Sequence, residues 1–132
     1  MNVQEKIDYW LNLAEEDFAV AVIVLQSNKY LHFGFLCHLT AEKLLKAYYW
    51  KNKSEEPPYT HNLLALSSKS ELNAELNERF QRLLYKLMPL NIEARYPSNK
   101  EEINRQLSKE YCTEIYNDTK DFLEWIKILL KR

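Results

Sequence analysis

Glycine is almost absent from this sequence, since Gly34 is the only glycine among 132 residues. Sheets joined by tight turns usually need more glycine than this, because such turns place residues at positive φ. Apolar residues also recur at three- and four-residue steps along most of the chain, which is the spacing of one helix face. We therefore predict an all-α fold, an up-and-down bundle of four or five helices with one short extra helix.

The length of the chain allows one domain with a real hydrophobic core and is too short for two comfortable ones. We therefore expect a single helical domain over residues 1–132. The net charge of -1 excludes an overall basic field that would attract nucleic acid or an anionic membrane. A local basic patch is still compatible with that charge.

The start of the sequence has no basic region followed by an apolar one, and no run approaches the ~18 apolar residues of a membrane span. We expect a cytoplasmic protein with no membrane contact and no cofactor. Cys37 and Cys112 fall in helical patterns without the spacing of metal ligands, so we interpret them as reduced, mostly buried thiols. A disulfide between them is the alternative.

The apolar periodicity predicts helices over residues 3–26, 30–51, 61–69, 73–88 and 98–130. A turn of very few residues separates the first two segments, so they are expected to be antiparallel neighbours.

Residues that favour helix starts precede the last three of these segments. Thr60 and Asn73 are the expected N-caps of the third and fourth helices, and Ser98 with Glu101 matches a capping box for the last one. Between the fourth and last helices, Arg95 and Tyr96 stand side by side in a segment that we interpret as a shaped loop.

The segment 30–51 is apolar on most of its circumference, which is typical of the central helix of a bundle. It nevertheless carries His38, Glu42 and Lys46 at successive i,i+4 steps, in one row along the helix. The simplest interpretation is an ordinary Glu42–Lys46 pair of about 0.2–0.5 kcal/mol beside a buried, hydrogen-bonded, neutral His38. A metal held by His38 and Glu42 would lack a nearby third ligand, so we predict no metal site. Gly34, in the same helix, suggests that another backbone passes close by, from the first helix or a second subunit.

Four short motifs, in the same order and over nearly the whole chain, resemble those of the HEPN domains (higher eukaryotes and prokaryotes nucleotide-binding domains). They are Leu13–Asp17, Ala41–Ala47, Thr60–Leu63 and Glu93–Pro97. The resemblance implies an up-and-down helical bundle that pairs into a homodimer in a prokaryotic cell. It also implies a minimal nucleotidyltransferase as partner, often in a toxin–antitoxin pair.

The sequence departs from the ribonuclease branch of that family, whose members carry an arginine followed a few residues later by a histidine. Here His61 is the last histidine and Arg79 is the first arginine, so no arginine precedes any histidine. No group that takes a proton near neutral pH follows Arg95 closely. We therefore predict no catalytic residues and favour binding over catalysis. An RNA-cleaving toxin that uses a displaced His38 or His61 with Arg95 is an alternative.

The resemblance and the polar row together predict one ligand-binding site. Arginine forks onto phosphate, tyrosine stacks on a base and carboxylates hold ribose hydroxyls. The expected ligand is a nucleotide, an RNA end or the nucleotidyltransferase itself. The predicted site residues are Asp17, Glu42, Lys46, His61, Arg95 and Tyr96.

Less specific interpretations are open for several of these residues. Asp17 is most simply a carboxylate at a solvated helix edge, His61 is compatible with a structural hydrogen bond, and Arg95 with an ion pair that locks its loop. An aromatic content of 13% exceeds what a small core needs, so a dimer that serves only to hold another polypeptide is a further alternative.

Overall fold

The computed structural model describes residues 1–91 and 97–132, and for residues 97–100 it describes the backbone alone. Arg95 and Tyr96 therefore lie outside the described residues, as does most of the predicted loop around them. The described part contains six α-helices and no strand, which confirms the all-α prediction. The helices are α1 (Val3–Gln26), α2 (Tyr30–Lys53), α3 (Leu63–Lys69), α4 (Glu78–Leu87), α5 (Pro97–Gln106) and α6 (Lys109–Leu130).

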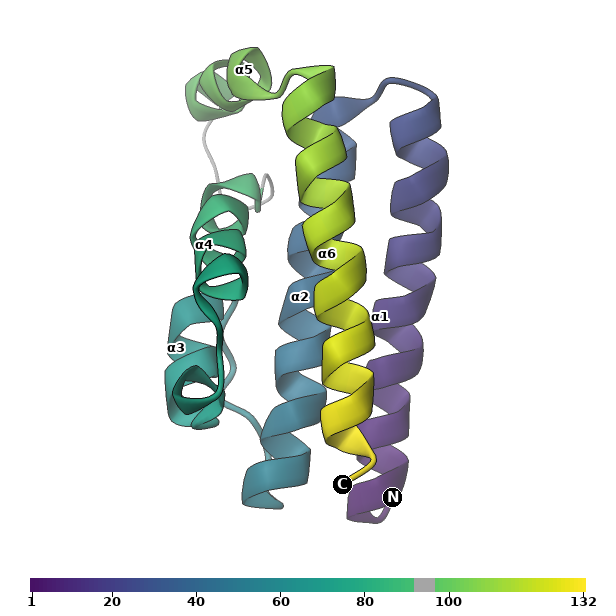
Figure 1. Ribbon diagram of the computed structural model, residues 1–132, viewed down its shortest axis with the longest axis vertical. Helices are drawn as coiled ribbons and strands as arrows, with labels where there is room; N and C mark the ends of the chain where they lie inside the picture. Colours follow the sequence, from purple (N-terminus) through teal and green to yellow (C-terminus); the bar gives the residue numbers. More distant parts are fainter. Residues whose placement is uncertain (92–96) are drawn as a thin grey trace.

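Three long helices, α1, α2 and α6, run side by side, and α2 and α6 share one direction, antiparallel to α1 (Figure 1). The shorter helices α3 and α4 follow each other along the flank of α2 and α6 that lies away from α1. Helix α5 crosses the upper end of the bundle, and both chain termini lie at the lower end. None of the helices in the described ranges is both long and apolar enough to cross a membrane.

The first two helices match the sequence prediction closely. The side chain of Asn2 caps α1 in a capping box with Glu5, and Asn28 turns the chain into α2 with a φ of 59°. Helix α2 extends two residues beyond the predicted end, and Ser54 terminates it in the left-handed region. Because the connection is so short, α1 and α2 are forced into antiparallel contact.

The N-caps predicted for the third and fourth helices were wrong. The Thr60 hydroxyl accepts a hydrogen bond from the Asn62 backbone N–H, which makes a turn, and Asn62 itself caps α3. Asn73 lies in a 3₁₀ turn, Leu72–Ala74, and Asn77 caps α4 instead. Both errors have the same cause: two polar residues with capping side chains stand within a few positions, and the later one takes the role.

The single helix predicted over residues 98–130 is two helices. Helix α5 ends at Gln106, and the Ser108 hydroxyl accepts a hydrogen bond from the Tyr111 N–H to start α6. The apolar spacing of Ile103, Leu107 and Tyr111 continues through the break, so the pattern alone gives no sign of it. The predicted capping box at Ser98 involves side chains outside the described residues.

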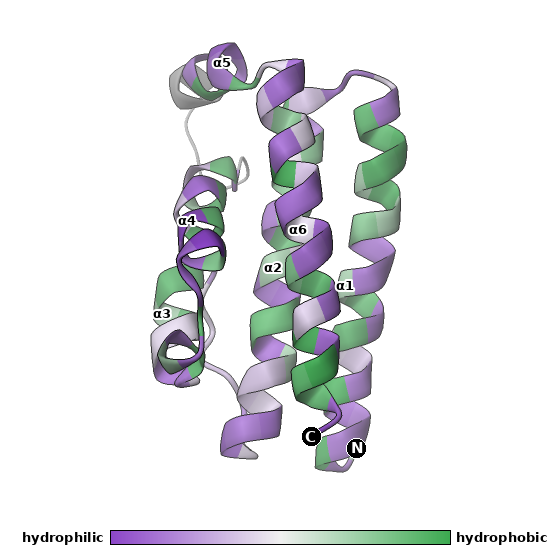
Figure 2. Ribbon diagram, viewed as in Figure 1, coloured by the Kyte–Doolittle hydropathy of each residue, from purple (hydrophilic) through white to green (hydrophobic). Residues whose placement is uncertain are grey.

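Helix α2 is the centre of the core, since most of its residues are buried and it contacts α1, α3, α4 and α6. Its residues Phe33 and Leu44 are fully buried, as are Phe122 and Ile126 of α6. Figure 2 shows hydrophobic and hydrophilic residues alternating along α6, as expected of a helix with one face in the core.

Within the chain, side chains and not the backbone of the first helix approach Gly34. A Cβ at this position would lie 3.0 Å from Leu90 Cδ1 and 3.7 Å from Leu107 Cδ1. The close neighbours are therefore side chains, not the backbone of α1. Gly34 lets two leucines from the segment before α6 pack against the start of α2.

Candidate functional site

Three of the predicted site residues meet at one buried carboxylate. The Glu42 side chain on α2 is 5% exposed. Its Oε1 lies 2.9 Å from Nδ1 of His61, and its Oε2 accepts a hydrogen bond of 3.0 Å from Nζ of Lys46. We call Glu42, His38, Lys46 and His61 the Glu42 cluster.

The chain brings these groups together by two different routes. Lys46 and His38 are one helical turn to either side of Glu42, so the regular geometry of α2 aligns them. His61 comes from the connection between α2 and α3, which doubles back along α2. The cap at Asn62 and the buried Leu63 fix the position of that connection. His61 is 57% exposed and is the part of the cluster most open to solvent.

The electrostatics of the cluster keep Glu42 ionised. Burial alone would raise the pKa of its carboxyl group, but the nearby imidazole of His38 and the hydrogen bonds with His61 and Lys46 outweigh burial and lower the pKa to about 2. A buried carboxylate is tolerated only when it is paired in this way. The cluster is therefore an anion surrounded by groups that carry, or can take up, positive charge.

His38 is an internal member of the cluster. Its Nδ1 lies 3.0 Å from the Leu87 carbonyl oxygen, and its Nε2 lies 3.5 Å from Glu42 Oε1. Both facing atoms are acceptors, so a neutral ring donates to only one of them, and the 3.5 Å contact is too long for a strong hydrogen bond. The predicted burial and hydrogen bond of His38 are confirmed. At 1% exposure His38 has no access to a ligand.

Lys46 connects the cluster to α1. Its ammonium nitrogen lies 5.1 Å from the centre of the Trp10 ring, over the ring face, while also bonding Glu42. The attraction between a cation and an aromatic face adds to the ion pair. The site therefore continues from α2 onto the N-terminal half of α1.

Asp17 is placed elsewhere. Its carboxylate accepts a hydrogen bond from Lys43, and both side chains are about one-fifth exposed. Within the described residues, no hydrogen bond or ion pair joins Asp17 to Glu42, Lys46 or His61. Asp17 therefore marks the edge between α1 and α2, beside the cluster and separate from it.

Neither metal binding nor thiol chemistry finds support in the described part of the chain. No group of three or more His, Cys, Asp or Glu residues there is arranged to hold a metal ion, and the Lys46 ammonium beside Glu42 would repel a cation. Both cysteines are free and buried, and burial raises the pKa of Cys37 to about 12 and that of Cys112 to about 11. Such thiols stay protonated and unreactive near neutral pH.

The low pKa of Glu42 predicts a specific loss of stability in acid. The stabilisation is complete above the unfolded-state pKa of 4.5 and is lost as pH falls towards about 2. The difference of 4.5 − 2 = 2.5 units corresponds to about 3 kcal/mol. Urea unfolding at pH 6 and pH 2.5 should show wild type losing more stability than Glu42→Gln, which has no carboxyl group to titrate. Equal losses in the two proteins would contradict the assignment.

Sequence reasoning did not place Trp10 or Lys6 near the site. The short turn at Asn28 makes these contacts predictable. In two antiparallel helices joined there, residues equally far before and after residue 28 lie opposite each other, so their numbers sum to about 56. Trp10 with Lys46 and Lys6 with Trp50 each sum to 56, and each pair is in cation–π contact.

The structure is an all-α bundle whose central helix carries a buried charged cluster. A comparison with models of protein families shows the family to which this bundle belongs. The family model of the HEPN domain matches residues 7–129, so the chain belongs to the HEPN family. Membership confirms the resemblance inferred from the four motifs and indicates a role related to nucleotides or RNA. No curated protein and no solved structure gave a significant match.

Proposed function

We propose that this HEPN protein binds a nucleotide or an RNA end at the Glu42 cluster, as the binding component of a two-component system. The observation that carries the proposal is the convergence of Lys46 and His61 on the ionised Glu42. Glu42 orients the imidazole through Nδ1, while the exposed edge of His61 stays accessible. A positioned imidazole and a positioned ammonium are suited to phosphate oxygens. We include Arg95 and Tyr96 in the proposed site on the basis of the sequence motif alone, since they lie outside the described residues.

Calorimetric titration of the wild-type protein with nucleoside monophosphates and short RNA tests this function. We expect saturable binding heat, and a smaller heat for Arg95→Ala because the arginine fork on phosphate is lost. A heat that is unchanged in Arg95→Ala would remove Arg95 from the site. The absence of any binding heat for the wild-type protein would remove the proposed function.

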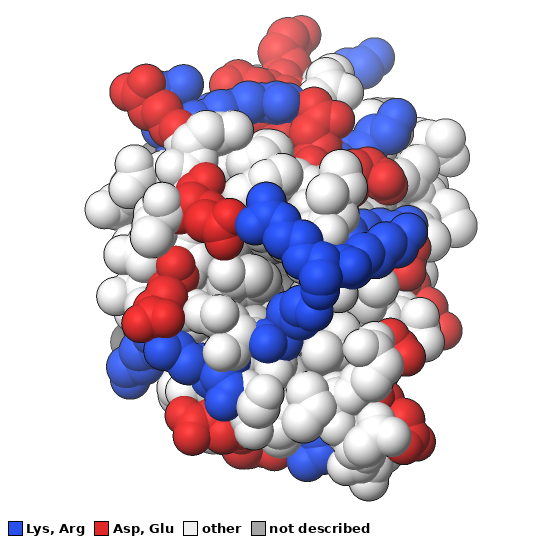
Figure 3. Space-filling view, turned by 60° about the horizontal axis from the view of Figure 1, so that its bottom comes forward, with Lys and Arg blue, Asp and Glu red and all other residues white. Residues whose placement is uncertain are grey.

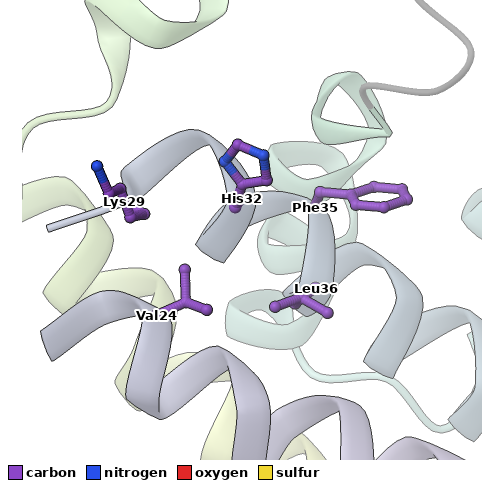
Figure 4. Close-up of a pocket in the computed structure, with 5 residues that line it drawn as sticks. All are labelled: Val24, Lys29, His32, Phe35 and Leu36. Atoms are coloured by element: carbon purple, nitrogen blue, oxygen red, sulfur yellow. The ribbon is translucent and has the colours of Figure 1, made fainter. Parts of the chain in front are cut away.

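A homodimer, and a minimal nucleotidyltransferase as partner in a prokaryotic cytoplasm, are part of the same proposal. The α1–α2 face supports a protein contact: Val20 and Ile23 are 47% and 62% exposed, and an open hollow of about 530 Å³ lies beside them. Figure 4 shows the hollow between the end of α1 and the start of α2. It is lined by Val24, Lys29, His32, Phe35 and Leu36.

Sedimentation tests the dimer through this face. Ile23→Glu places a charge on the exposed apolar surface, and we expect it to shift a wild-type dimer to monomer without unfolding it. Co-purification of the chain with the product of a neighbouring gene tests the nucleotidyltransferase partnership. A partner retained by a variant that no longer binds nucleotide would favour a dimer whose only role is to hold another polypeptide.

RNA cleavage is a second candidate, favoured by the Glu42–His61 hydrogen bond. A carboxylate that holds one imidazole nitrogen is the arrangement that orients a general base, and His61 is exposed whereas His38 is not. Incubation of labelled RNA with the protein and with His61→Asn tests it. Products from wild type alone would support cleavage, and no products at high protein concentration would exclude it.

A further inference from the structure

A second hollow lies next to the Glu42 cluster, at the end of the bundle that holds both termini. Its volume is about 260 Å³. The first turns of α1 form one wall, and the end of α2 with the segment after it forms the other. The lining residues are Met1, Lys6, Tyr9, Trp10, Trp50 and Glu56.

Three aromatic rings and one lysine, Lys6, line this hollow, and a second lysine, Lys46, lies on one of the rings. The Lys6 ammonium lies 4.3 Å from the centre of the Trp50 ring, and the Lys46 ammonium lies 5.1 Å from that of Trp10. Tyr9, which is 46% exposed, makes an edge contact with Trp10 at 5.4 Å between ring centres. Aromatic rings interleaved with cations are the usual means of holding an unpaired base next to its phosphate.

We propose that this hollow holds the base of the nucleotide, and that the phosphate of the same nucleotide lies at Lys46 and His61. The inference rests on the proposed nucleotide-binding function and adds to it the position of the base. Lys46 joins the two halves, since its ammonium is 3.0 Å from Glu42 Oε2 and also lies on Trp10. A base stacked on the rings therefore brings its phosphate within reach of the cluster.

The charges around the hollow select an anionic ligand over a cationic one. A quaternary ammonium also suits an aromatic pocket, but here it would meet the ammonium groups of Lys6 and Lys46. The opposing acid, Glu56, is 75% exposed and 3.8 Å from Lys6. Such a pair contributes little, so Lys6 is free to turn from Glu56 to a phosphate.

Basic side chains on the surface around the hollow could contact the backbone of an RNA, which a free nucleotide lacks. Figure 3 shows Lys and Arg side chains gathered on the end of the bundle that faces the viewer. Lys51 belongs to the last turn of α2 and Lys131 is the C-cap of α6, followed by Arg132 at the C-terminus, which pairs with Glu75. Part of their role is to complement the helix dipoles. If RNA is the ligand, its backbone should continue over these residues, and the contact should weaken in salt.

Tryptophan fluorescence provides the test, because two of the three tryptophans line the hollow and Trp125 does not. Trp125 packs against Phe80 and Phe122 instead. We titrate the full chain with AMP, UMP, a short oligoribonucleotide and, as a control, inorganic phosphate. We expect quenching by the nucleotides and not by phosphate. The quenching should persist in Trp125→Phe and shrink in Trp10→Phe.

Affinity measurements separate this inference from the proposed function. Tyr9→Ala removes an exposed ring, and we expect it to weaken nucleotide binding about 5-fold or more, from the stacking energy of one base. One outcome is that the oligoribonucleotide binds more tightly than the mononucleotides, with an affinity that falls in salt and in Lys131→Glu. That result would identify an RNA end as the source of the nucleotide. Nucleotide affinity unchanged in Tyr9→Ala and quenching unchanged in Trp10→Phe would overturn the base pocket and leave the proposed function standing. No binding of any nucleotide or RNA to wild type would overturn both.

Discussion

Replacing Glu42 with alanine is expected to lower the free energy of unfolding by about 3–5 kcal/mol. The substitution leaves Lys46, whose side chain is only 10% exposed, without its counter-charge and removes the acceptor facing His38 and His61. An uncompensated buried charge is among the costliest results of a single substitution. Urea unfolding followed by circular dichroism at neutral pH measures the difference.

Glu78→Ala is the matched control for this prediction. Glu78 also pairs with a cation one helical turn away, since Arg82 Nη1 lies 3.3 Å from its Oε1, but the Glu78 side chain is 83% exposed. We expect a loss below about 1 kcal/mol for Glu78→Ala, because solvent screens an exposed pair. Similar losses for Glu42→Ala and Glu78→Ala would show that the Glu42 cluster is an ordinary surface pair.

Phe122→Ala is expected to cost about 3–5 kcal/mol, as the second large effect. The Phe122 ring is fully buried and contacts Phe80 at 5.4 Å and Trp125 at 6.1 Å between ring centres. Its loss opens a cavity where α6 meets α4, and the rings around it are too rigid to fill the space.

Tyr85→Ala is the control for the core, because Tyr85 is an aromatic residue of α4 that is 62% exposed. We expect a change within about 0.5 kcal/mol for this variant. Thermal unfolding of both proteins gives the comparison. A small loss for Phe122→Ala would mean that α4 is not packed on α6 as the ring contacts indicate.

The sequence predicted those parts of the fold that depend on residues close together in the chain. The periodicity of α1 and α2 gave their limits within two residues, and the i,i+4 row placed Lys46 beside Glu42. The predicted N-caps failed where two candidates stood close together, as with Thr60 and Asn62. Propensity ranks such residues almost equally, and only tertiary packing decides between them.

Contacts between distant parts of the chain were predictable only in part. The family motifs pointed to His61 as a site residue, but the periodicity alone does not bring it to Glu42, 19 positions away. Asp17 was placed with the same site, yet Lys43 is its partner. Acidic and basic side chains on two packed helices can form ion pairs in several combinations. The rotation of α1 about its own axis, relative to α2, decides which pairs form.

The exposed histidine of the Glu42 cluster offers the most direct measurement of ligand binding. We compare wild type and His61→Ala by calorimetric titration with nucleoside monophosphates and a short RNA, and check the fold of both by circular dichroism. We expect His61→Ala to stay folded, because His61 is 57% exposed, and to bind at least about 10-fold more weakly, the equivalent of one charge-assisted hydrogen bond. A folded His61→Ala protein that binds as tightly as wild type would show that the cluster serves the structure of the bundle alone.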